Sequence, residues 1–243
     1  MTLFHRVDGP EDAPALVLSN SLGTTHELWD AQIAALVEHF RVLRYDQLGH
    51  GRSEVPPGPY TVEQLGRELL AVAPERFSFC GLSLGGAVGQ WVAANAPEQV
   101  ERLVLAGTSV DFGGRERWVD RAALAREAGL AELAAGTMER WFTPDFGGWV
   151  HWRDALEETP REGYAACCDA IRDWDFGAEL GRIQAPTLVL VGDEDPATPP
   201  DDARRIADGI PDAKLVVIPQ ARHLVNVEQP EAFTAAVLDH LLA

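Results

Sequence analysis

The chain has 243 residues, of which 46% are hydrophobic and 24% are charged, and its formal net charge is −18. This length suits one domain with a substantial core, and the negative charge repels nucleic acid and anionic membrane surfaces. No apolar run resembles a signal peptide or approaches the roughly 20 residues of a membrane span. We therefore expect a cytoplasmic protein that binds neither nucleic acid nor a membrane.

Short β-rich runs alternate with helix-length segments along most of the chain. The expected strands are residues 15–18, 42–45, 77–80, 103–106, 187–191 and 215–218. The expected helices are residues 29–38, 62–73, 84–96, 200–208 and 231–242. Because the strands are almost continuously apolar, the pattern predicts an α/β fold with a mostly parallel sheet and helices on both faces. Residues 1–15 are expected to add an antiparallel hairpin.

Residues 111–181 break this alternation. The segment has a helical pattern, contains the tryptophans at 118, 141, 149, 152 and 174, and shows no clear strand. We expect an inserted helical cap here, with residues 1–110 and 182–243 forming the core. Ligands of open α/β sheets bind at the carboxyl edge of the strands, so the cap is expected to cover that edge.

The run Gly81-Leu82-Ser83-Leu84-Gly85 fits the G-x-S-x-G pattern of a nucleophile elbow. An expected strand precedes it and an expected helix follows it, as that sharp turn requires. Glycines on both sides of the serine relieve crowding where the backbone is strained. This context favours Ser83 as a nucleophile over a serine that merely caps a helix.

A nucleophilic serine needs a base that is oriented by a carboxylate, and in hydrolases with this elbow the chain order is serine, acid, histidine. Asp193, Glu194 and Asp195 follow the expected strand 187–191. We favour Asp195, because Pro196 fixes the chain directly after it. The alternative is that all three acids only serve the turn, where aspartate is common.

The base is expected in the loop after the last strand, where His223 lies. His240 is the other late histidine, and its place on the terminal helix indicates a surface or packing role. The oxyanion that forms during acyl transfer needs N–H donors. We expect these donors to be the backbone N–H of Leu84, after the nucleophile, and that of Leu22, in the loop after the first strand; Ser21 is a weaker candidate.

The cysteines, Cys80, Cys167 and Cys168, are odd in number and two of them are adjacent, which disfavours a disulfide framework. They include no C-x-x-C pair, which disfavours a zinc site. The chemistry expected of this chain needs a small-molecule substrate but no metal or organic cofactor. The oligomeric state stays open.

The arrangement resembles the α/β-hydrolase superfamily over essentially the whole chain, and within it the 3-oxoadipate enol-lactonases. The runs that carry this resemblance are Asn20–Gly23, Gly81–Gly86, Arg140–Pro144, Gly163–Cys168 and Ala221–Pro230. The resemblance implies a serine hydrolase that opens the lactone ring of 3-oxoadipate enol-lactone through an acyl-enzyme, giving 3-oxoadipate in the β-ketoadipate pathway of aromatic catabolism.

The resemblance also implies a substrate with a free carboxylate. Arg140 is the first candidate to bind it and Arg172 the second, while Trp141 is expected to form a pocket wall. Solvent-exposed arginines and a tryptophan in the cap core are the alternatives. Two residues depart from the family pattern: Leu48 replaces an arginine in the run 45–53, and Trp174 stands where a small residue is expected. A pocket lined by Trp174 would select a different substrate.

Two other functions remain open. One is a serine esterase or lactonase that acts on another small ester. The other is a non-catalytic binding protein with the α/β-hydrolase fold, which the intact set Ser83, Asp195 and His223 disfavours.

Overall fold

A seven-stranded sheet forms the centre of the computed structural model, which describes every residue from Met1 to Ala243. Its strands are β1 (His5–Asp8), β2 (Ala15–Ser19), β3 (Arg41–Tyr45), β4 (Phe77–Leu82), β5 (Val100–Ala106), β6 (Thr187–Gly192) and β7 (Lys214–Ile218). They lie in the order β1-β3-β2-β4-β5-β6-β7, and every neighbouring pair except β1 and β3 is parallel. The central strands β4 and β6 are buried at every residue, which explains their continuous apolar runs.

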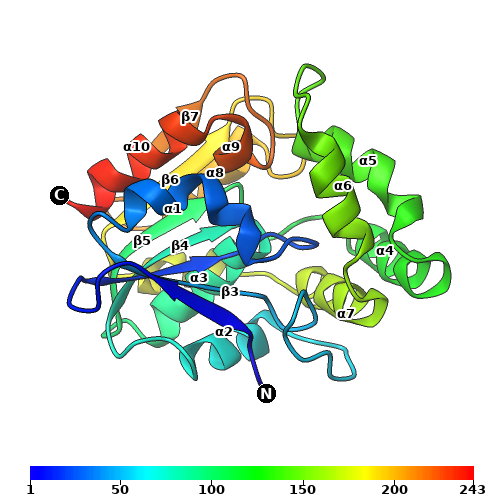
Figure 1. Cartoon of the computed structure of the whole chain (residues 1–243), viewed down its shortest axis with the longest axis horizontal. Helices are drawn as coiled ribbons and strands as arrows, with labels where there is room; N and C mark the ends of the chain where they lie inside the picture. Colours follow the sequence, from blue (N-terminus) through cyan, green and yellow to red (C-terminus); the bar gives the residue numbers. More distant parts are fainter.

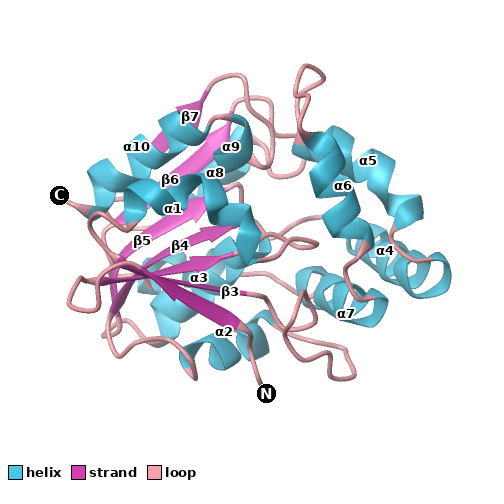
Figure 2. Ribbon diagram, viewed as in Figure 1, coloured by secondary structure: helices cyan, strands magenta, loops and turns pink.

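Helices cover both faces of this sheet (Figure 2). The helices of this layer are η1 (His26–Trp29), α1 (Asp30–Leu36), α2 (Val62–Leu70), α3 (Leu84–Asn95), α8 (Pro200–Gly209), α9 (Val225–Glu228) and α10 (Pro230–Leu241). Helices α1 and α10 pack together over one face, while α2 and α3 pack together over the other. No helix has the length and apolar content that a membrane crossing requires.

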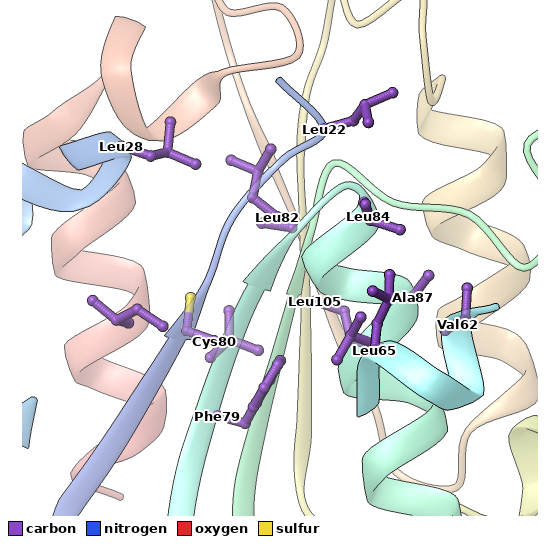
Figure 3. Close-up of a cluster of buried hydrophobic side chains, with 14 of the residues drawn as sticks. Leu22, Leu28, Val62, Leu65, Phe79, Cys80, Leu82, Leu84, Ala87 and Leu105 are labelled. Atoms are coloured by element: carbon purple, nitrogen blue, oxygen red, sulfur yellow. The ribbon is translucent and has the colours of Figure 1, made fainter. Parts of the chain in front are cut away.

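The hydrophobic core is one continuous cluster of 68 buried residues. Its side chains fill the space between the strands and the helices on either face (Figure 3). Leu65 of α2 lies beside Ala87 of α3, and the ring of Phe79 on β4 leaves no room for a Cβ at Gly89 of α3. The small residues of α3 therefore let this helix approach the sheet closely, which fixes the position of its N-terminus.

Only helices connect β5 to β6. They are α4 (Arg115–Ala128), α5 (Ala131–Trp141), α6 (Trp149–Glu157), α7 (Arg161–Arg172) and η2 (Gly177–Arg182). Helix α4 packs against α7 and α5, and α5 packs against α6, so these four form a layer beyond the carboxyl ends of the parallel strands (Figure 1). This layer lies within residues 111–181, for which the sequence predicts a cap, and we refer to α4–α7 as the cap.

The prediction of an antiparallel hairpin within residues 1–15 is wrong about which strands pair. Strand β1 is antiparallel, but its partner is β3, with His5 opposite Tyr45 and Asp8 opposite Val42. Strand β2 already has parallel partners on both sides, β3 and β4. No edge of β2 is therefore available to β1, and the first strand adds to the outer edge of the sheet instead.

Candidate active site

Ser83 occupies the turn between β4 and α3, with φ at 59° and ψ at −115°. Residues other than glycine rarely adopt this backbone conformation, and it persists only where the surroundings impose it. The Ser83 N–H donates to the carbonyl oxygen of Ala106 on β5 at 2.9 Å, and the Thr108 hydroxyl donates to the Ser83 carbonyl oxygen at 2.8 Å. Hydrogen bonds to the neighbouring strand and its loop thus hold the strained serine in place.

Gly81 and Gly85 are glycines because the turn has no room for a side chain at either position. A Cβ on Gly81 would overlap the carbonyl oxygen of Gly85, and a Cβ on Gly85 would overlap that of Ser19. The Gly85 N–H also donates to the carbonyl oxygen of Asn20 at 3.0 Å. The glycines of the elbow therefore bring it against the loop that follows β2.

The structure brings His223 and Asp195 together. His223 Nδ1 lies 2.9 Å from Asp195 Oδ2, and both residues are buried. A ring that donates its Nδ1 proton to the carboxylate leaves Nε2 free to act as a base. Asp193 and Glu194, the competing acids, are exposed at the surface.

Further donors fix the orientation of the Asp195 carboxylate. Its Oδ1 accepts from the N–H groups of Ala197 at 2.8 Å and Thr198 at 3.1 Å, and its Oδ2 accepts from the Thr198 hydroxyl at 2.8 Å. The same hydroxyl lies 3.3 Å from His223 Nδ1. Thr198 therefore supports both members of the pair, a role that sequence reasoning missed.

Ser83 and His223 line one cavity of about 290 Å³. Its floor comes from loops at the carboxyl edge of the sheet, and its roof comes from the cap. Leu22 and Ser21 lie on the floor, in the loop after β2. His240 lies elsewhere and is buried, with Nε2 at 3.1 Å from the carbonyl oxygen of Pro186, so of the two roles expected for it, surface or packing, the structure shows packing.

The two expected oxyanion donors have no backbone partner. The N–H of Leu84 opens α3, and the first N–H groups of a helix have no acceptor within it. The N–H of Leu22 also makes no backbone hydrogen bond. The Leu84 side chain points into the core (Figure 3), so only its backbone is available to the site. Their role as oxyanion donors stays a prediction.

His50 holds the loop that carries Leu22. The Gly23 N–H donates to His50 Nε2 at 2.9 Å, so this nitrogen must be unprotonated. Burial lowers the pKa of His50 from 6.5 to about 4, which keeps the ring neutral near pH 7. His50 has no role predicted from the sequence, although it lies in the run 45–53 that resembles the family pattern.

Arg140 and Trp141, the expected substrate-binding residues, both line the cavity from the end of α5. Arg172, the second candidate for the substrate carboxylate, does not. It pairs with Asp169 at 2.6 Å and with Asp173 at 2.5 Å on α7 and its C-cap, and it is absent from the cavity wall.

The two departures from the family pattern lie outside the cavity. Trp174 stacks on Phe176 with ring centroids 4.8 Å apart and donates its indole N–H to the carbonyl oxygen of Ser109 at 3.2 Å. Leu48 is fully buried, and its carbonyl oxygen lies 3.5 Å from Cys167 Sγ on α7. Both residues pack the cap against the core, so neither shapes the substrate pocket directly.

Sequence reasoning missed two further arginines of the cavity wall, Arg117 and Arg121 on α4. The spacing of four residues places them on one face of a helix, and this spacing was the available signal. The direction of that face depends on how α4 packs on α5 and α7, which the sequence alone does not reveal.

Comparison with known proteins gives a consistent result over nearly the whole chain. The model of the Alpha/beta hydrolase family matches residues 16–236. The chain is 38% identical to 3-oxoadipate enol-lactonase 2 of Acinetobacter baylyi, over 98% of this chain and 92% of the relative.

Two solved structures are similar throughout. The enol-lactonase from Burkholderia xenovorans LB400 has a TM-score of 0.97 and 42% identity, covering 99% of this chain and 96% of the other. A hydrolase from Pseudomonas aeruginosa PA01 has a TM-score of 0.95 and 47% identity, covering 99% and 94%.

Proposed function

The chain belongs to the alpha/beta hydrolase family, and we propose that it is a serine hydrolase that opens 3-oxoadipate enol-lactone to give 3-oxoadipate. The enol-lactonases of Acinetobacter baylyi and Burkholderia xenovorans, similar over almost their full lengths, support this carboxylic ester hydrolysis. The observation that carries the catalytic part is the buried pair of His223 and Asp195, of which His223 lines the same cavity as Ser83.

In the first step, His223 Nε2 takes the proton of the Ser83 hydroxyl while Oγ bonds to the lactone carbonyl carbon. Asp195 holds the ring and stabilises its charged form. The N–H groups of Leu22 and Leu84 donate to the oxyanion that develops on the carbonyl oxygen.

The tetrahedral intermediate then collapses, and the bond between the carbonyl carbon and the ring oxygen breaks. The proton on His223 passes to that oxygen, which leaves an enol that tautomerises to a ketone. Water, deprotonated by His223, attacks the acyl-enzyme and releases Ser83 and the new carboxylic acid. The net reaction consumes one water and needs neither a metal nor an organic cofactor.

The wall residues supply substrate contacts in this proposal. Trp141 forms an apolar wall beside the acyl chain, and Arg140 faces the free carboxylate of the substrate. We further propose that the enzyme acts in the cytoplasm, in the β-ketoadipate pathway of aromatic catabolism. Three free cysteines and no disulfide fit a reducing compartment.

A substrate panel tests this function. The expected result is a kcat/KM for 3-oxoadipate enol-lactone that exceeds those of simple lactones and alkyl esters. A higher kcat/KM for another small ester would favour the alternative esterase or lactonase. Failure of a fluorophosphonate to label Ser83 would instead favour a non-catalytic binding protein.

A further inference from the structure

Three arginines of the cap line the cavity of Ser83, and none of them pairs with an acidic side chain. Arg117 and Arg121 come from α4, and Arg140 comes from α5. Arg126, a cap arginine outside the cavity, differs from these three, because it pairs with Glu162 and Asp169. Asp120, the single acid in the wall, makes no ion pair with the three arginines. The wall therefore carries an excess of positive charge in a chain whose net charge is −18.

One threonine holds two of these guanidinium groups. Arg121 Nη2 donates to Thr137 Oγ1 at 2.7 Å, and Arg140 Nη2 donates to the same oxygen at 3.3 Å. Arg121 Nε donates to the hydroxyl of Tyr164 at 2.7 Å. Thr137 and Tyr164 are buried, so Arg121 is oriented by rigid partners. The Nη1 groups of Arg121 and Arg140 remain without an acceptor from the chain.

This arrangement places like charges together without a counterion. Burial lowers the pKa of Arg140, and the charges of Arg121 and Arg117 lower it further. Burial and Arg121 likewise lower the pKa of Arg117. An anion between the guanidinium groups would relieve the repulsion, and a carboxylate fits the planar donors of arginine with two oxygens.

We propose that Arg121 and Arg140, joined through Thr137, form a subsite for a carboxylate at the end of the substrate remote from the ester bond. The hydrolase then selects acyl chains that end in a carboxylate over neutral chains of the same length. Arg121 is the better oriented of the two, and Thr137 is a positioning residue. This inference rests on the proposed function to the extent that the substrate is an ester cleaved at Ser83.

Two p-nitrophenyl esters with one leaving group test the subsite. Mono-p-nitrophenyl adipate has an acyl chain of six carbons that ends in a carboxylate, as the 3-oxoadipoyl chain does, and p-nitrophenyl hexanoate is its neutral counterpart. The readout is the ratio of kcat/KM for the adipate ester to that for the hexanoate ester. The wild-type ratio is expected to be about 10 to 100, the contribution of a charged hydrogen-bonded pair.

The expected result is that Arg121→Gln or Arg140→Gln lowers this ratio about tenfold or more, and that Arg121→Lys recovers part of it. Thr137→Val lowers the ratio through a higher KM for the adipate ester, and Thr137→Ser restores it. Arg115→Gln is the matched control, because Arg115 lies on α4 but outside the cavity and pairs with Asp173. Because the readout is a ratio, partial loss of folded protein cancels.

A wild-type ratio near one overturns the subsite, as does an unchanged ratio in both Arg121→Gln and Arg140→Gln. The proposed function fails separately: a wild-type enzyme that prefers the adipate ester but leaves 3-oxoadipate enol-lactone intact supports the subsite and contradicts the function.

Discussion

At the scale of single residues, the candidate catalytic residues are identified by their positions along the chain as much as by the chemistry of their side chains. Ser83, Asp195 and His223 each follow the carboxyl end of a strand, so the elbow motif, the order of the strands and the proline after Asp195 were enough to nominate them. Their partners were not accessible in this way. Thr198 lies beside His223 and His50 accepts from Gly23, in each case from a loop far away in the chain, and local patterns do not contain those contacts.

Asp195→Asn is expected to lower kcat on the order of 10³ to 10⁴ with little change in stability. The amide keeps the shape of the carboxylate but has no negative charge, and an NH2 group in the place of Oδ2 cannot accept the Nδ1 proton of His223. Steady-state kinetics and a melting curve measure the two effects. Asp193→Asn is the matched control, since Asp193 is exposed, and it should remain active; equal losses in the two variants would contradict the assignment.

His50 makes the stability of the fold depend on pH. The pKa of His50 is about 4 in the folded protein, against the ordinary value of 6.5 that applies to the unfolded chain. Between pH 4 and 6.5 the unfolded chain therefore binds more protons than the folded protein. The stabilising contribution is complete above pH 6.5 and is lost as the pH falls toward 4. Urea unfolding from pH 7 to 4 should therefore show a shallower decline for His50→Gln than for the wild type. Parallel curves would mean that His50 is not the group responsible.

At the scale of elements, the sequence predicted the six parallel strands and the longer helices of the core to within a few residues, but it did not predict the short helix α9. Apolar runs and glycine turns are local, and they locate elements without reference to the rest of the chain. The pairing of β1 with β3 was missed, because it depends on which edge of the sheet is free. The choice of Arg172 as a second candidate for the substrate carboxylate failed for another reason. Asp169 lies three residues before Arg172, a spacing typical of an ion pair on one helix, and this spacing was visible in the sequence.

The elbow should tolerate no side chain at Gly85. Gly85→Ala forces a Cβ against the carbonyl oxygen of Ser19, and overpacking of this kind costs about 1 to 3 kcal/mol of stability. Chemical denaturation measures the loss. Gly181→Ala is the control, because a Cβ at Gly181 meets nothing within 4 Å. Equal stability of the two variants would show that the elbow can relax.

At the scale of the whole molecule, the active site exists only where two layers meet. Hydrogen bonds join the segment after β7, which carries His223, directly to the cap. The Leu224 N–H donates to the carbonyl oxygen of Trp141 at 3.2 Å, and the Thr143 N–H donates to Glu228 Oε1 at 2.7 Å. The sequence could predict that a cap covers the sheet, but not which of its side chains face Ser83. That information lies in the packing of α4, α5 and α7, which is why Arg117 and Arg121 emerged only from the structure.

The three cysteines report on the integrity of the whole fold. All are buried, and burial raises the pKa of each thiol, to about 12 for Cys168. Thiolates are the reactive form, so a thiol reagent should modify the native protein slowly and all three cysteines together as it unfolds in urea. Rapid modification of any cysteine in the native protein would contradict the burial of all three in the core.

The central claim is that Ser83 is the nucleophile of an enol-lactone hydrolase. The most direct measurement follows the ultraviolet absorbance of 3-oxoadipate enol-lactone in the presence of purified wild-type protein and the Ser83→Ala variant. We predict rapid loss of the lactone with the wild type and a kcat lower by roughly 10⁴ to 10⁶ in the variant. Hydrolysis of the lactone by Ser83→Ala at a rate near that of the wild type would contradict the claim.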